Sequence, residues 1–326
     1  MPPRAPWRWD RAPAGTPPPS ACPIATSCSP ITFAGPAVAS DAARVGQAAM
    51  HVNANDVVCL GAEPRWFLAT VLLPPDGDAA VLEPLFDGLR RACAAVGATL
   101  AGGHTEVSEA VSRLVVAGTM VGEVPLDRLY APTRIAAGDA LVQIGPAAIE
   151  GTALLAAETP GALRRAGLAP ATIAAAAALA DDPGISVVGM ARAAWDAPGL
   201  HSLHDPTEGG VATACGEMAL AAGLGVEVDE AETLVHPLTA AVAEALGIDW
   251  RGLLASGCLL AAVAEREADA FVARLRAAGE SACRIGRFTA SQGGPGRPAI
   301  LRASTGPRAL PRFTRDEALR VLSPEG

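Results

Sequence analysis

Apolar residues recur along the chain at two spacings, and each spacing predicts a kind of element. Residues 41–60 place apolar side chains on one helical stripe that also includes Asp56, and Gly61 follows as a helix-ending residue. The uninterrupted apolar run 66–73, closed by two prolines, predicts a buried strand. The same reasoning predicts a helix at 82–96 and strands at 99–101 and 113–124. These elements form one α/β unit.

A second α/β unit begins after the turn at residues 137–139. Its first strand is expected at 140–144. Helices are expected at 150–158, 169–179, 211–222, 237–246 and 267–278, and strands at 226–228, 258–264 and 283–288. We therefore predict an α/β protein with domains at 26–133 and 134–290, a disordered Pro/Arg-rich tail at 1–25 and a C-terminal tail at 291–326.

The composition excludes several classes of protein. The chain has 326 residues and no lysine, so all 25 basic residues are arginine, and a P-loop, a protein kinase or a pyridoxal enzyme is excluded. The net charge is −9 and the arginines are scattered, which argues against a nucleic-acid partner. No uncharged apolar run approaches the roughly 18 residues of a membrane span. The seven cysteines form no CxxC pair, so we expect free thiols and a cytoplasmic location.

The first segment with candidate chemistry is 51–56, His-Val-Asn-Ala-Asn-Asp. Helical spacing places Asn53 beside Asp56, and Asp56 falls on the apolar stripe. A carboxylate directed into a core is costly unless it is paired or bound to a metal, so this position favours a bound cation. The alternative is an exposed Asn/Asp cluster near a helix end.

The second segment is Gly102-Gly103-His104-Thr105, which follows the short strand predicted at 99–101. Paired glycines let backbone N–H groups approach an anion closely. The alternative is an ordinary tight turn.

The third segment is 201–210, His-Ser-Leu-His-Asp-Pro-Thr-Glu-Gly-Gly, between a strand and a helix. Asp205 can hold a divalent cation, while Gly209, Gly210 and the helix N-terminus offer N–H donors to phosphate. One alternative is a simple capped helix with Thr207 as the N-cap. Another is a zinc site made by His201, His204 and Asp205, which is disfavoured because histidines three apart in an extended segment point to different faces.

Taken in order, these segments resemble the PurM-like, AIR synthase-related superfamily, and most of all its branch that resembles the hydrogenase-maturation protein HypE. The resemblance covers the chain from about residue 30 to 289. It rests on residues 51–57, 61–64, 102–107, 118–124, 204–210 and 253–257.

The resemblance implies a two-domain protomer and a homodimer whose N-terminal domains form a shared β-barrel with ATP bound nearby. It also implies phosphorylation or dehydration of an oxygen-bearing substrate through a phosphorylated intermediate. Asp56 and Asp205 would bind the Mg²⁺ of Mg–ATP. Residues that would support Asp56 or meet the nucleotide are Asn53, Asn55, Gly102, Gly103, His104, Thr105, Thr207, Gly209 and Gly210.

The chain departs from the family pattern at three places. The N-terminal Gly-Asp-Asp-Ala segment is replaced by Pro/Arg-rich sequence, and Ser29 stands where a ligating aspartate is expected. The chain ends in Ser-Pro-Glu-Gly, whereas HypE ends in Pro-Arg-Ile-Cys. Ser29 and the altered N-terminus favour the alternative of a non-catalytic dimeric scaffold, or a maturation partner, with a degraded nucleotide site, and the different C-terminal residues give no basis for the reaction of HypE.

Overall fold

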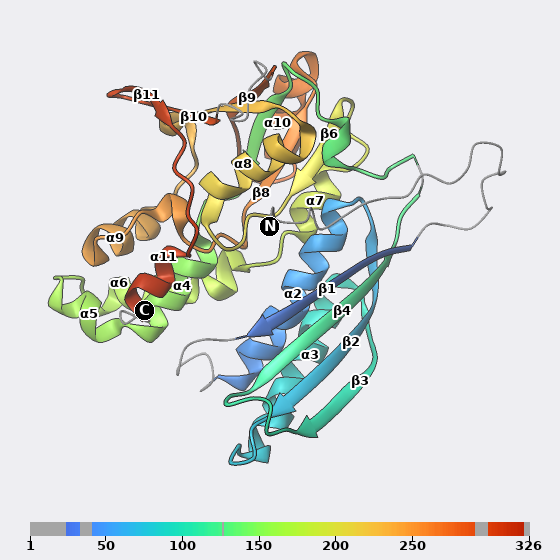
Figure 1. Cartoon of the computed structure of the whole chain (residues 1–326), viewed down its shortest axis with the longest axis vertical. Coiled ribbons are helices and arrows are strands. Elements are labelled where there is room, and N and C mark those ends of the chain that lie inside the picture. Colours follow the sequence, from blue (N-terminus) through green and yellow to red (C-terminus); the bar gives the residue numbers. More distant parts are fainter. Residues whose placement is uncertain (1–23, 33–40, 126, 291–298, 323–326) are drawn as a thin grey trace, which may run out of the picture.

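The computed structural model describes residues 24–32, 41–125, 127–290 and 299–322 (Figure 1). They form two domains, each built on one β-sheet. The predicted tail at 1–25 lies outside the described residues except for its last two positions, which belong to a strand. Among the described residues no single helix is long and apolar enough to cross a membrane, although one bent pair of helices, Pro170–Gly184 with Val188–Ala194, passes by length and composition.

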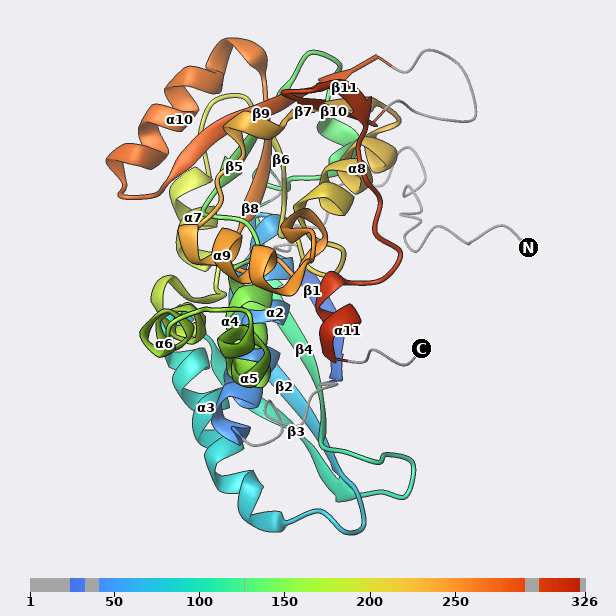
Figure 2. The same ribbon diagram turned by 90° about the vertical axis from the view of Figure 1, so that its left-hand side faces the viewer.

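The N-terminal domain is a four-stranded sheet with two helices on one face (Figure 2). Its strands lie in the order β1-β4-β2-β3, and only the β2–β3 pair is parallel. The elements are β1 (Ile24–Thr32), α2 (Ala42–Cys59), β2 (Glu63–Leu73), α3 (Leu82–Val96), β3 (Thr99–Val107) and β4 (Val115–Glu123).

The prediction that the apolar run 66–73 is buried on both sides is wrong. β2 alternates, so that Phe67 is fully buried against the helices while Trp66 and Leu68 are 43% and 40% exposed on the opposite face. A continuous apolar run in an open sheet therefore means one face in the core and one apolar face outside.

The strand predicted at 99–101 is longer than expected, because β3 continues through both glycines to Val107, and this excludes the alternative of a tight turn at residues 102–105. Its parallel partner β2 supplies the pairing: Leu68 aligns with Gly102 and Ala69 with Gly103 after a bulge. A Cβ on Gly103 would clash with the carbonyl oxygen of Ala69, so glycine is needed here for close strand approach.

The C-terminal domain is a seven-stranded mixed sheet in the order β11-β10-β7-β9-β5-β8-β6. Helices α8 and α10 lie on its opposite faces (Figure 2). The strands are β5 (Ala140–Ile144), β6 (Leu200–His204), β7 (Gly225–Asp229), β8 (Leu259–Val263), β9 (Ala282–Thr289), β10 (Ala299–Ala303) and β11 (Gly306–Ala309). The α-helices are α4 (Ile149–Glu158), α5 (Pro160–Arg165), α6 (Pro170–Ala178), α7 (Val188–Ala194), α8 (Gly210–Ala222), α9 (Pro237–Leu246), α10 (Ala268–Ala277) and α11 (Glu317–Leu322).

The expectation that the chain past residue 291 is only a tail is wrong for residues 299–322. β10 adds to the sheet in parallel with β7 and pairs with β11. Beyond β11 the chain passes α8 and ends in α11, whose Ala318 joins a buried cluster with Leu155 and Leu163 (Figure 2). The sheet edge and the α4–α6 helices therefore both depend on the C-terminal segment.

The two domains share one continuous core. A single buried cluster runs from the N-terminal helices into β5, β8 and α10. The indole Nε1 of Trp195 donates to the carbonyl of Val58 at 3.1 Å, and Arg128 forms two hydrogen bonds with Asp196 at 3.1 and 3.0 Å. Packing of this kind fixes the C-terminal end of α2 against the second domain.

Candidate functional site

Asp205 lies where the C-terminal end of α2 meets the loop after β6. Its side chain is buried, being 5% exposed, and its Oδ1 accepts a hydrogen bond from the thiol of Cys59 at 3.3 Å. Its Oδ2 is buried and has no hydrogen-bond partner among the described residues. Burial, followed by the charge of Asp56, raises the pKa of Asp205 to about 7. A buried carboxylate with an orphaned oxygen beside a second carboxylate is an environment that a cation would stabilise.

Asp56 is only half-buried, so the predicted helical stripe through it is displaced from the buried positions. The fully buried polar side chains of α2 are instead Asn53 and Asn55. Both faces of α2 are covered, one by the sheet and one by the second domain. The spacing of apolar residues could therefore not show which side of the helix carries the buried polar side chains. The charge of Asp56 nevertheless raises the pKa of Asp205 and of Cys59, so Asp56 lies within electrostatic range of Asp205, and their shared role as metal ligands stays a prediction.

The two asparagines are engaged with backbone groups. Asn53 Nδ2 donates to the carbonyl of Ala49 at 2.8 Å, and Asn53 packs against Gly118 of β4. Asn55 Nδ2 donates to the Ile185 carbonyl, and its Oδ1 accepts from the Val187 N–H, both at 2.9 Å. Asn55 therefore fixes the segment before α7 to α2. A direct role of either side chain in nucleotide binding stays a prediction.

His51 of α2 and His204 of β6 both have shifted pKa values, and His204 interacts with the carboxylates. Burial lowers the pKa of His51 to about 4, and its Nδ1 is buried without a hydrogen-bond partner in the described part of the chain. Burial also disfavours charge on His204, but hydrogen bonding to Glu217 at 3.3 Å and the charges of Asp205, Glu217 and Asp56 outweigh it, so that the pKa of His204 is raised.

The zinc alternative is not supported by these positions. His201 Nδ1 lies 2.7 Å from Asp139 Oδ2, whereas His204 pairs with Glu217. Within residues 41–125, 127–290 and 299–322 no group of three or more His, Cys, Asp or Glu side chains is arranged to hold a metal ion. The pair of Asp56 and Asp205 instead fits Mg²⁺, which proteins commonly hold through one or two carboxylates together with substrate phosphates.

The start of α8 differs from the alternative in which Thr207 caps the helix. Gly209, with φ of 78°, is the N-cap residue, and the side chain of Thr207 caps nothing. The Thr207 carbonyl accepts from the N–H groups of Gly210 and Ala255 at 3.1 and 3.3 Å. The N–H of Gly209, one of the predicted phosphate donors, is already bonded to Asp316 Oδ2 at 2.9 Å.

Glu150 and Ser256 form a buried polar group, in which Ser256 belongs to the motif 253–257 of the resemblance and only Glu150 was missed by sequence reasoning. Oε2 of Glu150 and Oγ of Ser256 are buried and lack hydrogen-bond partners among the described residues. Burial first, and then the charges of Glu208 and Asp316, raise the pKa of Glu150 to about 7, although the Ser256 side chain lowers it. The only sequence signal was the position of Glu150 in the first turn of a predicted helix.

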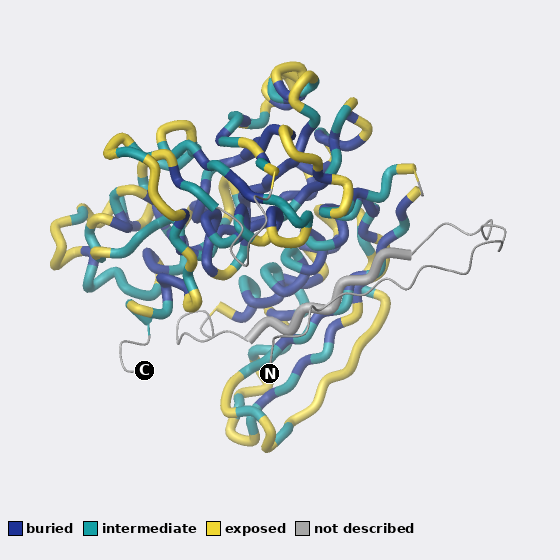
Figure 3. Tube along the Cα trace, turned by 45° about the horizontal axis from the view of Figure 1, so that its top comes forward, coloured by how far each residue is buried: buried dark blue, intermediate teal, exposed yellow. Residues whose placement is uncertain are grey.

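The segment from Gly102 to Thr105 lies on β3, the outer strand of the N-terminal sheet. All four residues are exposed, and Figure 3 shows β3 as an exposed stretch. His104 Nε2 contacts Glu106 Oε2 at 3.0 Å on the same strand. The contacts of this segment are thus with β2 and with itself, and its role toward phosphate stays a prediction. Ser29 of β1 pairs through its backbone with Gly118 of β4. Its place at a position where the resemblance expects a ligating aspartate stays a prediction.

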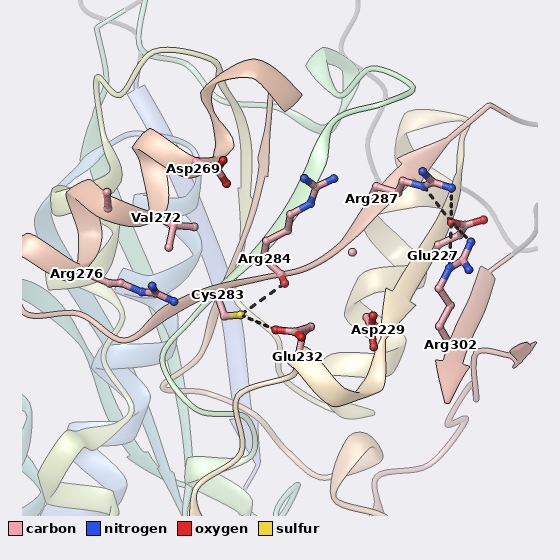
Figure 4. A pocket seen from close by; sticks show the side chains of 12 residues that line it. Glu227, Asp229, Glu232, Asp269, Val272, Arg276, Cys283, Arg284, Arg287 and Arg302 are labelled. Atoms are coloured by element: carbon pink, nitrogen blue, oxygen red, sulfur yellow. Dashed lines mark hydrogen bonds and ion pairs between the residues drawn. The ribbon is translucent and has the colours of Figure 1, made fainter. Parts of the chain in front are cut away.

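A wide cleft of about 1070 Å³ lies elsewhere, between α10 and the strands β9, β7 and β10 (Figure 4). Four arginines and four acidic residues line it. Arg287 and Arg302 both bond to Glu227, and Arg284 is paired with Glu265. The cleft is separate from the carboxylate pair, because neither Asp56 nor Asp205 lines it.

Comparison with known proteins agrees with the arrangement of the two domains. The family profile "AIR synthase related protein, N-terminal domain" matches residues 24–124, and the corresponding C-terminal domain profile matches residues 136–296. The chain therefore belongs to the AIR synthase-related, PurM-like family. Within that family it is HypE-like, as the resemblance in the sequence predicted.

Individual relatives support this placement. The carbamoyl dehydratase HypE of Rhodobacter capsulatus is 30% identical over 270 residues, which cover 82% of this chain and 74% of that protein. The solved structure of a hydrogenase maturation protein HypE in complex with ATP has a TM-score of 0.74 at 25% identity and covers 92% of this chain and 88% of its own. A HypE–HypF complex gives a TM-score of 0.71 at 20% identity, covering 89% of this chain and 90% of that one, and this match shows the fold alone. The predicted two-domain PurM-like fold is confirmed, while the shared dimeric barrel stays a prediction.

Proposed function

We propose that this protein binds Mg–ATP at the junction of its two domains and uses it for phosphoryl transfer to, or dehydration of, a small substrate or carrier group. The orphaned Oδ2 of buried Asp205, next to Asp56, is the observation that carries the proposal. The family and the ATP complex of a HypE relative support it. Bound Mg–ATP supplies a transferable phosphoryl group whose charge the metal partly neutralises.

The residues of this chain have separate tasks in the proposed site. Asp56 and Asp205 hold the cation from two domains, and the cation favours the ionised form of Asp205, which burial opposes. Asn55 keeps α2 and the segment before α7 in fixed positions, so the carboxylates stay together. The positive end of α8 faces the phosphates.

We further propose that the protein is a homodimer assembled through the uncovered face of the N-terminal sheet. Trp66 and Leu68 of β2 are exposed on this face. Apolar side chains gathered on one side of an open sheet are a common sign of an interface. A second copy of this chain would cover them.

Calorimetric titration with Mg–ATP, or a non-hydrolysable analogue, tests the nucleotide site. We expect micromolar, magnesium-dependent binding by the wild type, and at least tenfold weaker binding by Asp56→Asn and Asp205→Asn. Asp269→Asn, in the first turn of α10, is the matched control and should bind as the wild type does. Circular dichroism must show that all variants are folded. Equal affinity of wild type, Asp56→Asn and Asp205→Asn for Mg–ATP would contradict the assignment of these two carboxylates to the nucleotide site.

A non-catalytic scaffold or maturation partner is the second candidate, and the structure offers an observation in its favour. The four residues of the Gly102–Thr105 segment lie on an outer strand, and the Gly209 N–H is engaged by Asp316. A folded dimer in light scattering that shows no magnesium-dependent ATP binding would support this function. Association with a maturation partner protein would then be its activity.

A further inference from the structure

We propose that the Cys59 thiol makes the carboxylate pair select Mg²⁺ over Ca²⁺, because its hydrogen bond to Oδ1 of Asp205 leaves Oδ2 as the oxygen that binds the cation. Cys59 is then a positioning residue that acts through Asp205 and determines which divalent metal the site prefers. The inference rests on the proposed nucleotide function, in which Asp56 and Asp205 hold the cation.

The helix end that carries the thiol is held against the second domain. Cys59 is the last residue of α2, is 7% exposed and belongs to the core that both domains share. The carbonyl before it, that of Val58, accepts from the Trp195 indole at 3.1 Å and from the Gly61 N–H at 2.9 Å. Figure 1 shows this end of α2 beside α7. The thiol therefore has a fixed place relative to the second domain.

Asp205 is fixed from the other side of the contact. It follows β6 directly and precedes Pro206, and a residue before proline is restricted to extended backbone conformations. The Cys59 thiol donates to its Oδ1 at 3.3 Å, whereas its Oδ2 is buried and has no hydrogen-bond partner among the described residues. Buried polar atoms in native proteins nearly always have a partner. Oδ2 is therefore the atom that a cation would satisfy.

The thiol acts as a hydrogen-bond donor and not as a metal ligand. Burial, followed by the charge and the hydrogen bond of Asp205, raises the pKa of Cys59 well above its ordinary value, so the sulfur keeps its proton. A cation chelated by both oxygens of Asp205 would draw Oδ1 toward itself and away from this donor. In a buried side chain the lost hydrogen bond is not replaced by water. Chelation by Asp205 is therefore disfavoured, and binding through Oδ2 alone is favoured.

Mg²⁺ and Ca²⁺ respond differently to a carboxylate that offers one oxygen. Mg²⁺ takes six ligands in strict octahedral geometry at about 2.0–2.1 Å, and one or two carboxylates with substrate phosphates are enough for it. Ca²⁺ is larger, takes about six to eight oxygen ligands and commonly uses both oxygens of a carboxylate. A single oxygen from Asp205 therefore suits Mg²⁺ and deprives Ca²⁺ of a ligand.

A purely structural role of Cys59 is distinguished by the choice of variant. Cys59→Ser keeps a donor toward Oδ1, while Cys59→Ala removes it. Cys215→Ala deletes a fully buried thiol from the core around α8 and is the matched control for loss of packing. Loss of packing alone lowers stability but does not change the ratio of the Ca²⁺ and Mg²⁺ affinities, so this ratio is the quantity to measure.

The test is calorimetric titration of the folded proteins with MgCl₂ and with CaCl₂, each with and without a non-hydrolysable ATP analogue. We expect wild type to bind Mg²⁺ more tightly than Ca²⁺. In Cys59→Ala the ratio should shift toward Ca²⁺ by about three- to tenfold, the equivalent of one lost hydrogen bond. Cys59→Ser and Cys215→Ala should stay within about twofold of wild type. Cys59→Val lacks the donor, fills the space of the thiol and replaces Cys59→Ala if that variant does not fold.

A second comparison tests whether Cys59 acts through Asp205. When Asp205 is already changed to asparagine, adding Cys59→Ala should leave the ratio of the two affinities unchanged, because the carboxylate that the thiol orients is gone. A further shift of the same size in this double variant would overturn the inference.

The outcomes separate the metal preference from the nucleotide function. The same ratio in wild type and Cys59→Ala, an equal shift in Cys59→Ser, or tighter binding of Ca²⁺ than of Mg²⁺ by wild type would each overturn the role of Cys59 and leave the nucleotide site in place. A shifted ratio without any binding of the ATP analogue would support Cys59 and overturn the nucleotide function. Binding of neither metal under any condition would overturn both.

Discussion

The thiol of Cys59, the last residue of α2, lies 3.3 Å from Oδ1 of Asp205, which follows β6 in the other domain. The contact joins residues 146 positions apart and is buried. It gives Asp205 one hydrogen bond and leaves its second oxygen without a partner. The thiol therefore fixes the carboxylate through Oδ1 and leaves Oδ2 without a hydrogen bond.

Replacing Cys59 with alanine should destabilise the protein through Asp205. The change removes the donor to a buried carboxylate, which costs about 1–3 kcal/mol in the free energy of unfolding. Mg²⁺ should restore part of this loss, since a cation also stabilises the carboxylate. Chemical denaturation with and without Mg²⁺ measures both effects. Cys215→Ala, a buried cysteine packed in the apolar core around α8, should show no response to Mg²⁺ beyond that of wild type. The same magnesium response in both variants would contradict the prediction.

Glu150 should make the stability of the protein depend on pH. Its folded pKa of about 7 lies above the ordinary value of 4.5, so the folded state holds the proton more tightly than the unfolded state does. The contribution of Glu150 to stability is full below about pH 4.5 and is lost as the pH rises to about 7. The free energy of unfolding of Glu150→Gln should therefore exceed that of wild type by about 2–3 kcal/mol at pH 8 and equal it at pH 4.5.

Denaturation at the two pH values measures this difference. Glu244→Gln, on an exposed part of α9, is the control and should follow wild type throughout. Parallel pH curves for wild type and Glu150→Gln would show that burial does not perturb this carboxyl group.

Asn55→Ala should weaken the attachment between the domains. The substitution removes the Nδ2 donor to the Ile185 carbonyl and the Oδ1 acceptor of the Val187 N–H. These two backbone groups then lose their side-chain partner in a buried place. We expect a loss of about 2–4 kcal/mol by urea denaturation. Gln47→Ala, at a half-buried position of the same helix, should cost less than about 1 kcal/mol. Similar losses for the two variants would mean that the Asn55 bonds contribute little.

The paired glycines of β3 should respond differently to alanine. A Cβ on Gly103 would meet the Ala69 carbonyl oxygen and push β3 away from β2, whereas a Cβ on Gly102 has open space around it. We expect Gly103→Ala to lose at least 3 kcal/mol, or to fail to fold, and Gly102→Ala to stay within about 0.5 kcal/mol of wild type. Thermal unfolding of the two variants, which differ by one position, is sufficient. Equal melting temperatures would show that the strands tolerate the extra atom.

Elements whose signal is local were predicted from the sequence. β5 was placed at residues 140–144, and α2, α8 and α9 were found within a residue or two, because each has its own periodicity or apolar run. The carboxylates Asp56 and Asp205 were identified through motifs, although the reason first given for Asp56 was wrong about its face. Their proximity could be inferred only from the family resemblance.

Features that depend on distant partners could not be predicted. The glycines at 102 and 103 signal a turn locally, but pairing with β2 extends the strand through them. Thr207 matches a capping residue, yet Asp316, 107 positions beyond Gly209, supplies the acceptor at the start of α8. β10 and α11 lie in sequence rich in proline, glycine and arginine and are held by the sheet and by α4. Tertiary contacts outweigh local propensity at these places.

The position of α11 also sets an order for folding during synthesis. The four-stranded sheet pairs only residues within 24–123, so all of its strands have been made when less than half of the chain is complete. The buried cluster of α4, α5, α6 and α9 instead waits for Ala318, and the sheet edge at β7 waits for β10. Contacts of long sequence separation form slowly. The nascent second domain therefore exposes an open sheet edge and an uncovered apolar helix surface until residues 299–322 leave the ribosome, and this is the interval in which a chaperone would matter most.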